Sequence, residues 1–167
     1  LVGLVLISTT IVAALNLPNQ PVTINVVNGT TSYFISTLSG VPADYDVEDG
    51  VYPGWCADRD IYMVRSTNHQ VTLSDDYANL PVTFQGQWDK INWILNNKGS
   101  HSVLNLQNAF WYLLGDLTWN EISTTSKSII CSANSSGGGF EPQSGDIIAI
   151  VAIPTGREAE TYCQCSF

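Results

Sequence analysis

The clearest hydrophobic pattern in the chain lies between residues 103 and 114, and it predicts an α-helix. Ser102 is suited to cap the start of this helix, and Gly115 is suited to end it. Gln107 falls on the apolar face, where burying an unpaired primary amide costs about 1–3 kcal/mol. We therefore expect its amide either to form local hydrogen bonds or to be chemically altered. The apolar face consists of Val103, Leu106, Phe110 and Leu114.

The pattern elsewhere predicts a mixture of helices and strands. A helix over residues 88–97 has Ile91 and Leu95 on one face, and a third helix is expected over about residues 123–133. Together the elements predict one α+β domain over residues 20–167, with an antiparallel β-sandwich or barrel-like core and two or three helices. Strands are expected within residues 19–38, with a turn at Asn28-Gly29, and within 51–64, 66–83, 147–153 and 161–167.

The first 17 residues are almost wholly apolar and precede Pro18. A retained signal peptide would need a basic start, and a transmembrane helix usually needs about 20 apolar residues. A third explanation is an extended strand, which the β-branched run over residues 7–12 favours. We treat residues 1–19 as a separate segment. It is expected to insert into a neighbouring subunit and build a homopolymer, with a membrane anchor or burial in its own core as alternatives.

Charge and composition narrow the possible partners. The 167-residue chain has a net charge of −9, which argues against binding to nucleic acid or to anionic lipid. Neither a cofactor nor a metal site is expected, because the histidines are isolated and the acidic loop over residues 40–50 fits no standard calcium loop. Four cysteines and two glycosylation sequons, at Asn28 and Asn134 in predicted surface turns, favour an extracellular location.

Four motifs, taken in order, resemble the thioester domain of bacterial and archaeal surface proteins. In that family, a cysteine that follows an aromatic residue is joined to the glutamine of a Gln-x-Ala-(Ile/Phe)-Trp helix. The matching residues here are Cys56, which follows Trp55, and Gln107 in Gln-Asn-Ala-Phe-Trp. Leu106 and Phe110 depart from the Thr and Ile that are frequent in the family at these positions. The other two motifs are the helix over residues 88–97 and the Gly-Phe-x-Pro turn with its strand over residues 139–150.

The resemblance implies an internal thioester, with Cys56 as thiol donor and Gln107 as acyl donor. If folding holds the sulfur against the amide carbon, an effective molarity of order 10⁵ M or more can offset the poor reactivity of an amide. The product can accept an amine, so the resemblance also implies covalent attachment to an amine-bearing surface target. Asp58 is a candidate to orient the cysteine loop. The residues expected to shield the bond from water are Trp55, Trp111 and Tyr112.

The remaining cysteines follow from this assignment. Cys163 and Cys165 lie two positions apart on a predicted strand, so they share a face and are poorly placed to bond each other. If Cys56 is acylated, we expect Cys131 to pair with one of them. Alternatively, Cys56 is a small buried residue or half of a disulfide, Gln107 is a core amide bonded to backbone, and four cysteines allow three pairings.

The sequence therefore favours a non-enzymatic function on the cell surface. We expect a secreted structural or adhesive subunit of a surface or pilus-like filament. One alternative is a cysteine-dependent acyl-transfer enzyme with His69 or His101 as base, although both histidines lie in polar stretches typical of loops. Another is a carbohydrate-binding surface module that uses exposed aromatic residues, of which the chain has 5 Trp and 7 Tyr.

Overall fold

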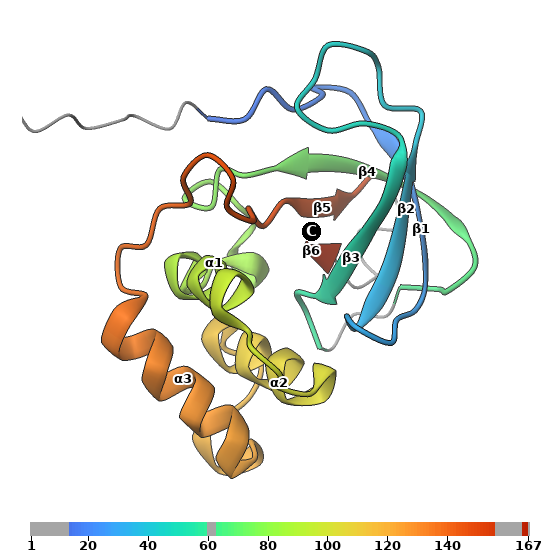
Figure 1. Ribbon diagram of the computed structural model, residues 1–167. Coiled ribbons are helices and arrows are strands. Elements are labelled where there is room, and N and C mark those ends of the chain that lie inside the picture. Colours follow the sequence, from blue (N-terminus) through green and yellow to red (C-terminus); the bar gives the residue numbers. More distant parts are fainter. Residues whose placement is uncertain (1–13, 60–62, 156–164, 167) are drawn as a thin grey trace, which may run out of the picture.

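The computed structural model describes residues 14–59, 63–155 and 165–166, and it places an antiparallel β-barrel beside three α-helices (Figure 1). The predicted α+β fold with a barrel-like core is therefore confirmed. The strands are β1 (Val22–Asn28), β2 (Phe34–Ser39), β3 (Gly50–Cys56), β4 (Asn68–Ser74), β5 (Val151–Pro154) and β6 (Cys165–Ser166).

The barrel closes in the order β1-β2-β3-β6-β5-β4, with every neighbouring pair antiparallel. Alternate residues point inward, as the period of a strand requires, so that Val22, Ile24 and Val26 of β1 are buried in the core. The closing strand β6 is very short. Its Ser166 lies opposite Trp55 of β3 on one side and Val151 of β5 on the other.

The three helices pack together beside the barrel (Figure 1). In α2, Ser102 Oγ accepts a hydrogen bond from the backbone N–H of Asn105, and Gly115 ends the helix with a left-handed φ of 97°, as the sequence predicts. The C-terminal end of α3 is at Gly137. The helices are α1 (Trp88–Asn97), α2 (Val103–Leu114) and α3 (Thr124–Ser136), with short 3₁₀ turns η1 (Val82–Phe84) and η2 (Trp119–Glu121).

The predicted strand over residues 147–153 is confirmed only from Val151 onward. The preceding residues are held by side chains of α1 instead of by a strand. Asn96 Oδ1 accepts a hydrogen bond from the backbone N–H of Ile147, and Asn92 Oδ1 accepts one from that of Ala149. Among the described residues, the segment over residues 147–150 therefore has no strand as a hydrogen-bonding partner.

Several expectations fall outside the described residues. They include most of the apolar segment, residues 1–13, and all of the last predicted strand except the two residues of β6. Within the stretch over residues 51–64, β3 ends at Cys56. Of the strand predicted there over residues 61–64, the first two residues lie outside the described residues, and neither Met63 nor Val64 belongs to a strand. None of the helices in the described ranges has the length and apolar character needed to cross a membrane.

Candidate functional site

Gln107 of α2 and Cys56 of β3 meet in the interior, although 51 positions separate them in the sequence. The Gln107 side chain has an exposed fraction of 0 %. Its Nε2 donates a hydrogen bond to the backbone oxygen of Cys56 at 2.7 Å, and its Oε1 accepts one from the backbone N–H of Cys56 at 2.9 Å. The nitrogen and the oxygen of the amide are therefore each paired with the main chain of Cys56, the residue predicted to be its partner.

Packing between α2 and the end of β3 produces this contact. Trp55 precedes Cys56, and its ring meets that of Phe110 edge to face, with centroids 5.0 Å apart. Both rings are buried. Since Phe110 lies one helical turn after Gln107, the same face of α2 carries the amide and its apolar cover.

The sulfur of Cys56 is engaged in a disulfide in this structure. This is the alternative in which Cys56 is half of a disulfide, and it excludes a thioester in the same molecule. Cys165 lies opposite Cys56 in the register of β3 and β6, but the side chains of Cys163 and Cys165 are outside the described residues. Cys56 Sγ also lies 2.9 Å from the carbonyl oxygen of Asp58.

The expected pairing of Cys131 with Cys163 or Cys165 is wrong, because Cys131 is free and exposed. The orientation of α3 explains this. The residues that α3 buries include Ile129, Ile130 and Ala133, and Cys131 falls on the opposite face.

The candidate shielding residues lie in different surroundings. Trp111 is 9 % exposed and packs edge to face against Tyr33, with ring centroids 5.6 Å apart. Tyr33 was not identified from the sequence, because its contact with α2 depends on how the β1–β2 hairpin packs. Tyr112 is only half-buried and packs against Trp119. Asp58 is buried, with an exposed fraction of 6 %.

The two sequons are accessible. Asn28 is exposed at the end of β1, and Asn134 is exposed on α3, where its Oδ1 accepts a hydrogen bond from Lys90 Nζ. The expectation that Asn134 lies in a turn is wrong, because α3 extends past it to residue 136.

The histidines differ from each other. His101 is exposed between α1 and α2, as expected for a surface histidine. The expectation of a polar loop is wrong for His69, which is buried in β4 with its Nε2 2.8 Å from the backbone oxygen of Val64. Within the described ranges, no group of three His, Cys, Asp or Glu side chains is placed to hold a metal ion.

Comparison with solved structures identifies a similar fold. The N-terminal domain of the Streptococcus pyogenes pilus tip adhesin Cpa is 12% identical in sequence, and the match covers 89% of this chain and 93% of that chain with a TM-score of 0.51. No protein-family model and no curated protein sequence matches the chain. At this identity the likeness concerns the fold alone, so the chain shares its architecture with a domain of a pilus tip adhesin.

Proposed function

We propose that this chain is an extracellular surface or filament subunit of the adhesin type, with Cys56 and Gln107 able to form an intramolecular thioester. The observation that carries this proposal is the pair of hydrogen bonds that hold the buried Gln107 amide on the main chain of Cys56. The fold likeness to a pilus tip adhesin domain supports the surface location. The apolar segment over residues 1–17 is proposed to join neighbouring subunits.

The chemistry needs only these two side chains. The Cys56 thiol adds to Cδ of Gln107, the C–N bond breaks, and the nitrogen leaves as ammonia with the proton of the thiol. The short distance between the two residues makes this step intramolecular. The resulting thioester can then be attacked by a primary amine of a target surface. That second step forms an amide at Gln107 and regenerates the Cys56 thiol.

The disulfide at Cys56 sets a condition on this reaction. A sulfur in a disulfide cannot act as a nucleophile toward Gln107, so the thioester can form only while Cys56 is reduced. The two bonds are therefore alternative states of one sulfur. The buried position next to Trp55 and Phe110 protects either state from water.

The test is the intact mass of the unglycosylated chain, reduced with a phosphine because phosphines leave thioesters intact. We expect a mass short by one ammonia, and a gain of one methylamine after treatment with that amine. Cys56→Ala and Gln107→Ala serve as matched controls and should both show their full mass. A full mass for the native chain would contradict the thioester, and a short mass without a methylamine adduct would limit the bond to a structural role.

The two alternative functions gain no support from the site. His101 is at the surface, and His69 is buried with its Nε2 beside a backbone carbonyl, so neither position favours a base for Cys56. Trp55, Trp88 and Trp111 are buried, which makes most of the tryptophan content part of the core instead of a sugar-binding surface.

A further inference from the structure

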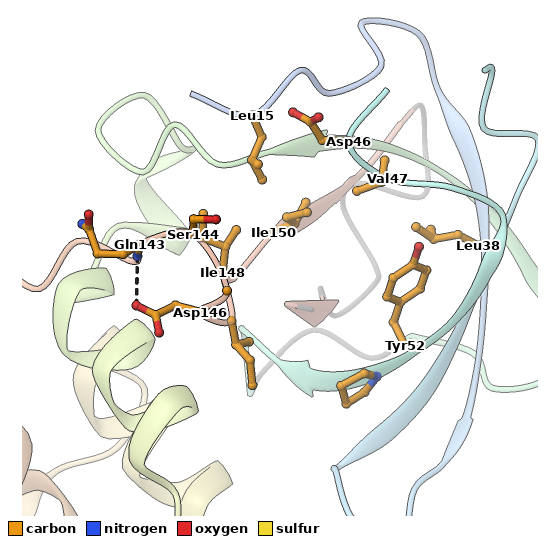
Figure 2. Close-up of a pocket in the computed structure, with 13 residues that line it drawn as sticks. Leu15, Leu38, Asp46, Val47, Tyr52, Gln143, Ser144, Asp146, Ile148 and Ile150 are labelled. Carbon is orange, nitrogen blue, oxygen red and sulfur yellow. Dashed lines mark hydrogen bonds between the residues drawn. The ribbon is translucent and has the colours of Figure 1, made fainter. Parts of the chain in front are cut away.

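An apolar slot of about 840 Å³ opens in the wall of the barrel (Figure 2). One flank is β3, through Tyr52 and Pro53, and the other is the segment that leads into β5, through Ile148 and Ile150. We propose that this slot receives residues 1–13 of a second copy of the chain as an added strand. The inference rests on the filament part of the proposed function and is independent of the thioester.

The slot is one strand wide. Ser166 of β6 lies between Trp55 of β3 and Val151 of β5 and is opposite both residues. On one side of the slot, β3 extends from these positions back to Gly50, and its other edge is paired with β2. On the other side of the slot, the chain extends from Ile150 back to Ile147. An added strand would therefore follow the line of β6 with a flank on each side.

One flank of the slot offers backbone groups for a new ladder. In an extended chain, successive residues direct their N–H and C=O groups to opposite sides. Asn96 of α1 bonds both backbone groups of Ile147. For Ala149, Asn92 of α1 accepts from the N–H, and the Tyr77 hydroxyl donates to the carbonyl oxygen. In the part of the chain that the structure describes, no hydrogen bond of the Ile148 backbone is found, and by the same alternation we infer that its N–H and C=O point away from those of its neighbours, toward the slot that Ile148 lines. An added strand would supply partners for them.

The apolar N-terminal segment has the composition that the slot requires. Residues 1–13 carry no charged side chain and contain a β-branched run, while the slot is lined mainly by apolar side chains. Leu15 is itself part of the lining, so the residues that directly follow the apolar segment lie beside the slot. The backbone there is held by hydrogen bonds from Leu15 N–H to Asp75 and from Asn16 N–H to Asp46.

The sequence at this point favours a neighbour's slot over the chain's own. Residues 12–14, Val-Ala-Ala, include none of the Gly, Pro, Asn or Asp residues typical of tight turns, which disfavours a reversal of the chain there into its own slot. Thirteen extended residues span about 43–47 Å, whereas a four-residue strand needs about 13 Å, so the segment is long enough to reach the next subunit.

The test separates donor from acceptor. Ile148→Asp places a charge in the slot and keeps residues 1–13, while deletion of residues 1–13 removes the donor and keeps the slot. By light scattering, we expect the native chain to have at least twice the monomer mass and each variant to be monomeric. A mixture of the two variants should form a one-to-one heterodimer. Val82→Asp, at an 82 % exposed residue of η1, is the control and should assemble like the native chain.

Three outcomes would overturn the proposal. The first is that Ile148→Asp assembles like the native chain, and the second is that the native chain is monomeric. The third is that both variants are folded by circular dichroism but form no heterodimer when mixed. A monomeric native chain whose residues 1–13 resist proteolysis would indicate occupation of its own slot. Intact mass measured on the same samples shows whether the chain is short by one ammonia. Failure of assembly is thereby distinguished from failure of thioester formation.

Discussion

The side chain of Gln107 takes the place of a peptide group at the end of β3. Its Oε1 accepts a hydrogen bond from the backbone N–H of Cys56, and its Nε2 donates one to the backbone oxygen, as a neighbouring strand would. This explains how a fully buried amide is tolerated on an otherwise apolar face of α2.

Replacing this amide should therefore destabilise the fold. In Gln107→Ala, the N–H and C=O of Cys56 lose their partners, at about 1–3 kcal/mol for each buried group, so the free energy of unfolding should fall by about 2–6 kcal/mol. Urea unfolding of chains with the intact amide, verified by mass, measures the change. Gln70→Ala, at an exposed residue of β4, should change stability by less than about 0.5 kcal/mol. Equal effects in the two variants would contradict the role of the amide.

At this scale the sequence predicted part of the site. The burial of Gln107 follows from its place on the helical stripe, because that periodicity is local. The choice of Cys56 as its partner came from the family resemblance and agrees with the contact. The disulfide state of Cys56 could not be chosen in advance, because it depends on how β6 aligns with β3.

At the scale of elements, side chains of α1 bond the segment before β5, which lies beyond the end of its pairing with β4. Asn92 and Asn96 bond the backbone that leads into β5, and Tyr77 adds a hydrogen bond from its hydroxyl to the backbone oxygen of Ala149 at 2.6 Å. The Tyr77 hydroxyl in turn accepts a hydrogen bond from Asn92 Nδ2. These contacts fix the helix against one flank of the slot.

The partly buried Tyr77 makes stability sensitive to alkaline pH. Burial raises the pKa of its phenol from 10.0 to about 12, with the Asp75 charge adding to the rise. Above pH 10 the phenol ionises in the unfolded chain and not in the folded one, so its contribution is present below pH 10 and is lost as the pH rises toward 12.

Tyr77→Phe should remove this pH dependence. We expect it to lower the free energy of unfolding at neutral pH by about 1–3 kcal/mol, because the Ala149 oxygen loses its donor, and to flatten the decline above pH 10. Tyr112→Phe retains Tyr77 and should keep the decline. Denaturant unfolding at several pH values measures both variants, and an unchanged slope in Tyr77→Phe would refute the assignment.

The boundaries of α2 were predictable from the sequence, but the absence of a strand over residues 147–150 was not. The ends of α2 follow from Ser102 and Gly115, whose effects are local, whereas α3 continues to Ser136, past the predicted end at about residue 133. The segment over residues 147–150 has the composition of a strand, but its partners are helix side chains that lie about 50 positions away in the sequence. No local pattern encodes that contact.

Across the whole molecule, Cys56 is the point where the barrel, its closing strand and the helical layer meet. β6 pairs with β3 at this residue, and α2 approaches it through Gln107. Cys56 is also half of a disulfide, and Cys131 is not its partner because Cys131 is free. A thioester would instead tie β3 to α2.

If the two bonds compete, removing the disulfide partner should favour the thioester. Cys165→Ser, at the residue opposite Cys56, should raise the fraction of chains short by one ammonia, with Cys163→Ser as the matched comparison. Intact mass after expression under oxidising conditions measures that fraction. If both variants have a free Cys56 thiol and a full mass, packing alone does not activate Gln107.

The location of this covalent bond decides how far the chain can be stretched. If a subunit is pulled by its ends, a Cys56–Gln107 bond removes the intervening 51 positions from the extensible length, which is about 170–180 Å of unfolded chain. The excluded stretch contains β4, η1 and α1. A disulfide to the C-terminal end would exclude α2 and α3 as well. Whether Cys56 forms a thioester or a disulfide thus sets the mechanical compliance of the subunit.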